Sequence, residues 1–191
     1  EEPPLATRRT GFLAPKVEAQ RRERAALPVV LLTRRSSAGS EGLLLGAWSG
    51  KLLGDLDMTL ERFMTRPLYF GGPSEDGLAM LHPYPDLPGS QRLTPDGLAI
   101  SHDYDAACDW ISEGPGSSLR FKFFLNRVMW APDEEDELSP ERGIWMPARC
   151  SRDLLLREPD SSFEEPLWSQ IAERAGGVLG EVARNHSLLA S

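Results

Sequence analysis

The apolar residues of this chain occur in short runs, and glycine or proline closes most of them. The chain holds 17 glycines and 16 prolines among 191 residues. No run approaches the roughly 18 consecutive apolar residues that cross a bilayer, so the sequence predicts no transmembrane segment. Short apolar runs bounded by turn-forming residues are typical of β-strands. We therefore expect a strand-rich fold, with strands at residues 28–33, 42–48, 67–70, 77–81, 97–101, 119–130 and 143–147.

Helices are expected at three places among these strands. Residues 52–64 carry apolar side chains at mostly helical spacing. Asp103 can cap a helix that begins directly after it. A third helix is expected from about Glu164, and Gly176-Gly177 would kink or split it. Strands and helices do not alternate regularly, so we expect a single compact α+β domain over residues 28–185, followed by a tail at residues 186–191.

Positive charge is concentrated at the N-terminus. Residues 1–35 carry a net charge of +4 within a chain of net charge -8, so the other residues carry -12. Residues 1–27 have few large apolar side chains, and we expect them to form an extended basic arm. The arm is either a solvated tail or a segment that docks on an acidic partner or a membrane surface. Its candidate partner contacts are Arg21, Arg22 and Arg24. The acidic total argues against direct nucleic-acid binding.

Residue types used in catalysis do not form a recognisable set in this sequence. His82, His102 and His186 lack the spacing of zinc ligands, so no metal site is expected. The sequence contains no nucleophile turn and no phosphate-binding glycine loop, so we assign no catalytic and no cofactor-binding residue. The five carboxylates at residues 133–137 are expected to form a solvated acidic loop.

Two further features are expected to be structural. Gly71-Gly72-Pro73 should turn the chain sharply after a strand, because glycine tolerates positive φ and proline fixes the next φ. Cys108 and Cys150 are expected to be structural thiols. A regulatory disulfide between them is the alternative, and it would need Cα atoms within about 7 Å.

Five strings of the chain resemble segments of one protein family. They are LPVVLLTRRSSAGSEGLLLGAWSG, RPLYFGGPSEDGLAMLHPYP, RFKFFLNRVMWAPDEEDEL, GIWMPARCSRDLLL and FEEPLWSQIAERAGGVLGEVAR. In this order they are similar to the YqgE/AlgH family. The resemblance implies an α+β fold with a small, bent, partly barrel-like sheet surrounded by helices, and it implies no established reaction. The last string is most similar to plant and algal members, which are expected in plastids.

The chain departs from the family pattern at two places. Gly46-Ala47-Trp48 stands where the family has "NRP", and Asn126–Glu134 stands where it has "GYAGWGPGQ". Glycines allow positive φ and close backbone approach, so we expect their loss to remove any small-ligand pocket that they formed. A larger apolar surface is expected instead, because Met and Trp are favoured in interface cores. The candidate partner-binding residues are Trp48, Arg127, Val128, Met129 and Trp130.

These features favour a non-catalytic protein that binds a larger protein complex as an auxiliary subunit or assembly factor. We expect the complex in the chloroplast, in the stroma or at the stromal face of the thylakoid, where it could be membrane-associated. A chain that begins at Glu1 suits a processed N-terminus. The first alternative is a ligand or redox sensor, or an enzyme, with a pocket near His82, Asp103 or Cys108. The second is a transcriptional regulator, by analogy with the label given to bacterial family members.

Overall fold

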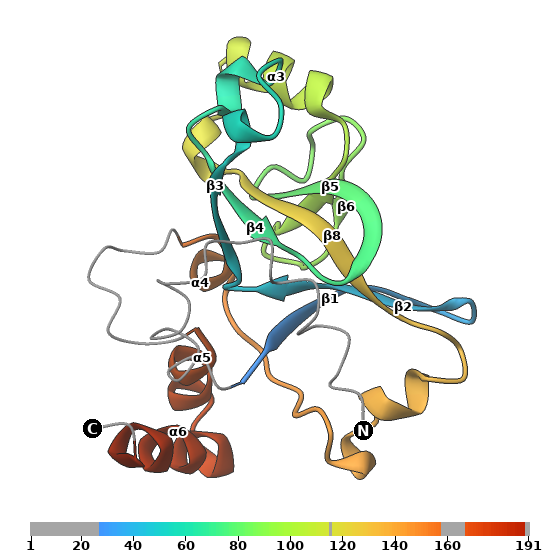
Figure 1. Cartoon of the computed structure of the whole chain (residues 1–191), viewed down its shortest axis with the longest axis vertical. Helices are drawn as coiled ribbons and strands as arrows, with labels where there is room; N and C mark the ends of the chain where they lie inside the picture. The colour runs from blue at the N-terminus through green and yellow to red at the C-terminus, as the bar shows by residue number, and fades with distance from the viewer. Residues whose placement is uncertain (1–26, 115, 158–166, 190–191) are drawn as a thin grey trace.

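The computed structural model describes residues 27–114, 116–157 and 167–189, which form a curled sheet with helices around it (Figure 1). The strands are β1 (Val29–Ser36), β2 (Gly39–Leu45), β3 (Trp48–Leu52), β4 (Pro67–Phe70), β5 (Ser74–His82), β6 (Gln91–Arg92), β7 (Ala99–Ser101) and β8 (Lys122–Trp130). The α-helices are α3 (Tyr104–Ser112), α4 (Arg152–Leu156), α5 (Leu167–Ala175) and α6 (Gly177–Leu189). Short 3-10 turns lie at η2 (Leu53–Asp55), η3 (Glu61–Phe63), η4 (Ser118–Arg120), η5 (Glu135–Leu138) and η6 (Pro140–Arg142). The α+β class is confirmed.

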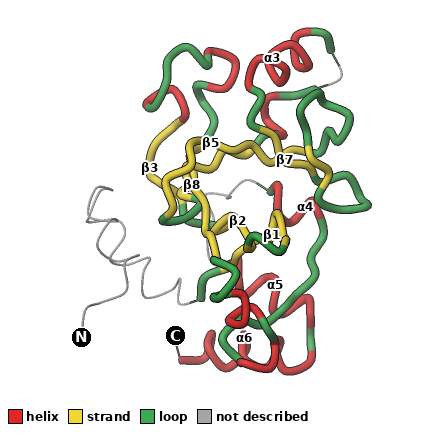
Figure 2. The backbone as a smooth tube through the Cα atoms, turned by 90° about the vertical axis from the view of Figure 1, so that its right-hand side faces the viewer, coloured by secondary structure: helices red, strands yellow, loops and turns green. Residues whose placement is uncertain are grey.

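Strand β8 is the centre of the sheet. Along one side it pairs antiparallel with β5. Along the other side it pairs first with β4, in parallel at residues 123–125, and then with β2, antiparallel at residues 128–130. The order of the main sheet is β1-β2-β8-β5-β7-β6, and β3 lies beside β4 at an edge. The side-chain amide of Gln91 in β6 donates to the Thr33 carbonyl of β1 at 3.3 Å. The two ends of the strand order therefore meet, and the sheet curls into a half-barrel (Figure 2).

Asn126 marks the corner at which β8 exchanges β4 for β2. Its φ is 66°, the one positive φ of a non-glycine residue among those described. Gly71 and Gly72 pack against this corner, where a Cβ on either would lie less than 3.0 Å from backbone atoms of Asn126 or Arg127. Gly71 also donates its amide to the Leu125 carbonyl at 2.7 Å. The segment Gly71-Gly72-Pro73 thus links β4 to β5 and lets two backbones touch.

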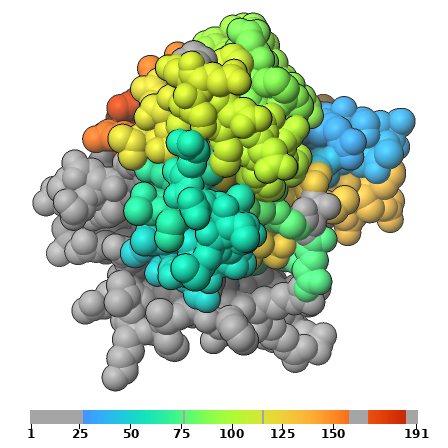
Figure 3. Space-filling view, turned by 90° about the horizontal axis from the view of Figure 1, so that it is seen from above, coloured from blue at the N-terminus to red at the C-terminus, as the bar shows by residue number. Residues whose placement is uncertain are grey.

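The sheet separates two apolar cores, because side chains alternate between its faces. Leu81 and Phe124 belong to the core inside the curl, whereas their neighbours Met80 and Phe123 belong to the core beneath α3. A smaller cluster joins α5 to α6 through Trp168, Ala172 and Ala183. Figure 1 places α3 at one end of the molecule and the α5–α6 pair at the other. Figure 3 shows the surface near α3, with the segment between β3 and β4 in teal.

Several local predictions are confirmed. The strands expected at residues 28–33, 42–48, 67–70, 77–81, 97–101 and 119–130 all overlap observed strands. The Asp103 side chain accepts from the Ala106 amide at 3.0 Å and caps α3. Gly176 and Gly177 have φ values of 67° and 53° and separate α5 from α6. α6 runs on through residues 186–189, which the sequence had placed in a tail.

The predicted helix over residues 52–64 is wrong. The segment forms the two separate turns η2 and η3 instead. Its backbone hydrogen bonds cross the loop, with the Gly54 amide donating to the Met64 carbonyl at 3.0 Å. The Asp55 side chain accepts from the Leu52 amide at 2.9 Å. Such a side-chain acceptor competes with helical hydrogen bonding and favours a turn.

The predicted strand over residues 143–147 is also wrong, because this segment pairs with no described strand. Gly143 has a φ of 67° and closes η6. Trp145 then packs edge-on against Trp130, with ring centroids 5.9 Å apart. Packing of one aromatic side chain, rather than strand pairing, holds this segment.

The basic arm with Arg21, Arg22 and Arg24 lies almost wholly outside the described residues, and so does the expected helix start at Glu164. No helix among the described residues is long and apolar enough to cross a membrane.

Candidate functional site

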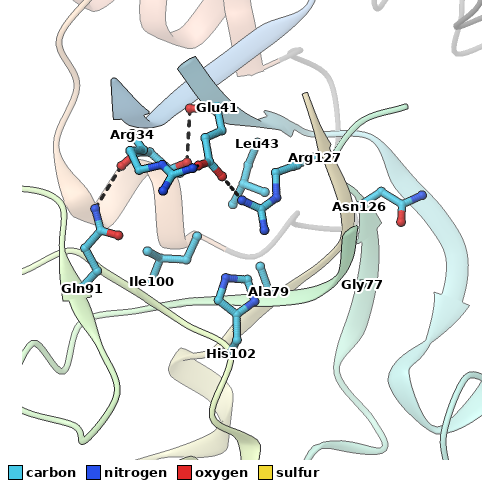
Figure 4. Close-up of a pocket in the computed structure, with 11 residues that line it drawn as sticks. Arg34, Glu41, Leu43, Gly77, Ala79, Gln91, Ile100, His102, Asn126 and Arg127 are labelled. Carbon is cyan, nitrogen blue, oxygen red and sulfur yellow. Dashed lines mark hydrogen bonds and ion pairs between the residues drawn. The ribbon is translucent and has the colours of Figure 1, made fainter. Parts of the chain in front are cut away.

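A cavity of about 200 Å³ opens where the two ends of the curled sheet meet. Strands β1, β2 and β8 form one wall, and strands β5, β6 and β7 face them (Figure 4). The cavity is lined by Thr33, Arg34, Glu41, Leu43, Gly77, Ala79, Gln91, Ile100, His102, Asn126 and Arg127. Charged, amide and imidazole side chains therefore surround a small space with a partly apolar floor.

Glu41 is the buried centre of the polar wall, with 5% of its surface exposed. The two-residue turn between β1 and β2 sets a register in which Arg34 lies directly opposite Glu41. Arg127 approaches from β8, two residues before Met129, which pairs with Glu41. Each guanidinium forms an ion pair with one carboxylate oxygen of Glu41. Three strands are thus tied together at the mouth of the half-barrel by one carboxylate.

The two arginines influence each other. Burial lowers the pKa of Arg127, and the positive charge of Arg34 lowers it further. The two cations lie close together because each contacts one oxygen of the same Glu41 carboxylate. The three charged lining residues sum to one positive charge, so the wall favours a negative ligand.

The facing wall adds neutral donors and acceptors. His102 lies 3.0 Å from the Leu78 carbonyl through Nδ1. A carbonyl only accepts, so Nδ1 carries the proton and Nε2 is left for the cavity. Figure 4 shows the His102 ring pointing toward the Arg34–Glu41–Arg127 cluster, with Ile100 and Ala79 beside it.

The expected loss of a pocket at the substituted glycines is not observed, because Asn126 and Arg127 both line this cavity. Asn126 adopts the left-handed conformation that glycine favours, which asparagine tolerates better than most residues. Its side chain points away from the charged cluster (Figure 4). The replacement therefore kept the backbone corner.

The predicted partner-binding residues do not form one surface. Trp48 and Met129 are exposed at 44% and 53%. Met129 pairs with Glu41 near the start of β2, whereas Trp48 lies beyond the other end of β2. Trp130 is buried against Trp145, Arg127 lines the cavity, and Val128 is half-buried.

The residues of the alternative pocket are also separated. His82 is fully buried, accepts from the Tyr84 amide at 3.3 Å, and has its pKa lowered to about 4 by burial. Cys108 lies half-buried on α3, where burial raises the pKa of its thiol. Asp103 caps α3 and lines a separate, open hollow together with His102. His82 is a core residue, and no single site contains all three.

Both cysteines are free thiols, and Cys150 is exposed. Partial desolvation by neighbouring protein atoms raises the pKa of each thiol, and for Cys150 the charge of Asp96 raises it further, so neither is activated as a thiolate. Within residues 27–114, 116–157 and 167–189, no group of three or more His, Cys, Asp or Glu side chains could hold a metal ion. The acidic segment at residues 133–137 contacts a buried residue through Glu135, which accepts a 2.5 Å hydrogen bond from the Ser40 hydroxyl.

Sequence reasoning missed the lining residues Arg34, Glu41, Gln91 and His102. The sequence did contain one indication of this site. Glu41 is the single carboxylate in a strand of otherwise apolar or small residues, and Arg34 lies as many residues before the hairpin turn as Glu41 lies after it. A charge on the buried face of a strand needs a partner, and the hairpin register supplies one.

A family model described as DUF179, AlgH-like, matches residues 15–180. UPF0301 protein BF2109 of Bacteroides fragilis is 31% identical over 133 residues, which are 68% of this chain and 66% of that protein. The match thus spans slightly less than two thirds of that relative.

Two solved structures share the fold. The AlgH protein of Pseudomonas aeruginosa has a TM-score of 0.60 and 22% identity, covering 82% of this chain and 83% of its own. Protein DIP2367 of Corynebacterium diphtheriae has a TM-score of 0.64 and 18% identity, covering 82% of this chain and 81% of its own. The ordered motifs, the family model and the curled sheet agree, and the chain belongs to the AlgH-like family.

Proposed function

We propose that this chain is a non-catalytic subunit or assembly factor that binds a partner protein through an exposed apolar lobe. The lobe consists of Trp48, Leu52, Leu56, Met58 and Met64. All five are large apolar side chains with at least 36% of their surface exposed, and Met58 reaches 73%. All five lie within residues 48–64, and this concentration of exposed apolar side chains in one segment carries the proposal, because exposed apolar patches mark interaction sites.

The lobe is held in shape by the backbone beneath it. Two of its members belong to β3, an edge strand that pairs with β4 among the described strands. The others follow in the loop, which is closed by a hydrogen bond from the Leu53 amide to the Arg66 carbonyl at 2.8 Å. Phe63 anchors the loop from below, where it is fully buried. A preformed surface loses little conformational entropy on binding.

The composition of the lobe suits a protein partner. Methionine and tryptophan are enriched at interfaces, and flexible Met side chains adapt to the shape of a partner. The sequence predicted a binding surface that contains both Trp48 and Met129. The proposed lobe contains Trp48 but not Met129. The basic arm stays a second expected contact, directed to an acidic partner.

The size of the protein in native extract tests this proposal. A tagged chain should elute with a partner, well above its 21.2 kDa mass. The double variant Leu56→Ser/Met58→Ser should elute as the free chain, whereas Val178→Ser on α6, exposed to 70%, should behave as the unmodified protein. Retention of the complex by the lobe variant, or elution of the unmodified chain as a monomer, would contradict the proposal.

The plastid location and the plant or algal type belong to the same proposal. They are supported by the similarity of the C-terminal string FEEPLWSQIAERAGGVLGEVAR to plant and algal members. Detection of the protein in purified chloroplasts, divided into stroma and thylakoid fractions, tests the location. Its presence in another compartment alone would reject it.

Ligand sensing is the second candidate function, because the cavity at the barrel mouth offers a defined binding space. An enzymatic role and a role in transcription stay predictions. The transcription hypothesis is tested by DNA retardation at low salt, where a chain of net charge -8 should give none.

A further inference from the structure

The cavity at the mouth of the half-barrel offers polar groups in addition to the Glu41 ion pairs that tie its strands together. It places two guanidinium groups, a buried carboxylate, an imidazole and a side-chain amide around an open space. The Gln91 amide and the Ile100 side chain come from strands on the far side from Arg34. We propose that this cavity binds a small monocarboxylate with a short apolar substituent.

The charge of the cavity selects an anion. Arg34 and Arg127 each contact a different oxygen of Glu41, so one carboxylate holds two cations side by side. The lowered pKa of Arg127 reflects both its burial and the nearby charge of Arg34. A second carboxylate placed against the two guanidinium groups would offset this repulsion. The net charge of +1 on the three ionic side chains matches a ligand with a single negative charge.

Guanidinium groups also provide the geometry for this ligand. An arginine presents several N–H donors in a planar fork, so it can contact Glu41 and a ligand carboxylate at the same time. The His102 ring faces the same space and borders the site, while the guanidinium groups supply the donors for a ligand carboxylate.

The floor and the volume restrict the rest of the ligand. Leu43, Ala79 and Ile100 form an apolar floor, and all three are buried to at least 92%. The cavity volume is about 200 Å³. This space admits a carboxylate with a few methyl or methylene groups, and it is smaller than the roughly 300 Å³ at which drug-sized sites begin.

Binding can be measured on the full chain by following backbone amide signals during titration with isobutyrate. Isobutyramide has nearly the same shape without the charge, and inorganic phosphate has charge without an apolar group. We expect isobutyrate to shift the signals of Glu41 and His102 with a Kd of about 1 mM or tighter. Isobutyramide and phosphate should bind at least about tenfold more weakly. The signal of Met58, in the apolar lobe, should not move.

Variants of the neighbouring residues Arg34 and Arg35 distinguish ligand binding in the cavity from charge effects at the protein surface. Arg34→Gln should weaken isobutyrate binding about tenfold, and Arg34→Lys, which keeps the charge and loses the fork, should weaken it less. Arg35→Gln is the matched control, because Arg35 is similarly exposed and lies toward Glu135 at 3.8 Å. Its affinity should stay within about twofold of the unmodified protein.

Three results would overturn the proposal. They are the absence of cavity shifts with isobutyrate, equal binding of isobutyramide, and phosphate binding as tight as isobutyrate binding. In the first case the arginine pair serves only to close the barrel. The lobe variant Leu56→Ser/Met58→Ser should bind isobutyrate normally, so failure of this inference and failure of the proposed function are distinguishable.

Discussion

At the scale of single residues, two side chains show how burial and backbone geometry determine a role. His82 carries chemistry that could serve catalysis, yet it lies in the core between Tyr84 and Phe121, with ring centroids 6.2 and 5.0 Å away. Its Nδ1 accepts from the Tyr84 amide, so the neutral ring is the form that fits. For Asn126 the backbone matters more than the amide side chain, because its left-handed φ of 66° forms the corner of β8.

Acid should destabilise the protein through His82. Its folded pKa of about 4 lies below the ordinary 6.5, so the unfolded chain binds the proton first as the pH falls. The stabilisation is complete above pH 6.5 and is lost down to about pH 4, a total of about 3 kcal/mol. Urea unfolding across this range should show a shallower pH dependence for His82→Gln. Equal slopes for both proteins would refute the assignment.

Substitutions at Asn126 should follow backbone preference. Glycine adopts a φ of 66° without strain, whereas a β-branched residue does so at a cost of about 1–2 kcal/mol. We expect Asn126→Val to lower the free energy of unfolding by that amount and Asn126→Gly to lower it less. Chemical denaturation of the two variants measures the difference. If glycine is as harmful as valine, the side chain of Asn126 and not its φ is what the fold requires.

At the scale of elements, the corner of β8 depends on the glycine turn that touches it. β4 and β2 lie end to end along β8, and the turn after β4 must pass between them. The Leu44 amide of β2 donates to the Gly71 carbonyl at 2.7 Å, and the Gly71 amide donates to Leu125 of β8. Both neighbours approach so closely that no side chain fits.

Gly71→Ala should therefore be costly. The added Cβ would overlap the Asn126 carbonyl, so we expect a loss of more than about 2 kcal/mol of stability. Gly50→Ala is the matched comparison, since nothing lies within 4 Å of the added Cβ there and only its φ of 80° opposes the change, by about 1 kcal/mol. Thermal or urea unfolding ranks the two, and the reverse order would disprove the close-packing argument.

At the scale of the whole molecule, the half-barrel is closed by a few polar contacts at its mouth. The Gln91–Thr33 hydrogen bond joins the first and last strands of the sheet order. The ion pairs of Glu41 join β1, β2 and β8. Below the mouth the apolar core inside the curl supplies the packing, and α5 and α6 lie at the end of the molecule away from α3 (Figure 1).

Removing the shared carboxylate should loosen this closure. Glu41→Gln removes the buried carboxylate that the exposed Arg34 and the half-buried Arg127 both contact, so we expect a loss of about 3 kcal/mol in the free energy of unfolding. The double variant Arg34→Gln/Glu41→Gln should regain part of it, because one of the two cations is removed as well. A double variant that is less stable than Glu41→Gln would show that Arg34 acts independently of the carboxylate.

Local information explains which parts of the fold could be predicted. Strand positions follow from short apolar runs bounded by glycine and proline, because these residues favour turns over regular structure. The Asp103 cap and the break at Gly176-Gly177 depend on hydrogen bonds and φ values within a few residues. The fold family follows from the order of the motifs, which is also a property of the sequence alone.

Tertiary contacts decided the rest. Residues 52–64 have helical spacing, but the Gly54–Met64 bond and the buried Phe63 impose a loop. The cavity arises because the curl of the sheet brings Arg34, Glu41 and Arg127 together with His102. Such contacts join residues far apart in the chain, and their energies depend on burial and mutual distance. The sequence by itself therefore determined which segments form most of the strands, and only the folded sheet decided their bounds and which side chains meet at its mouth.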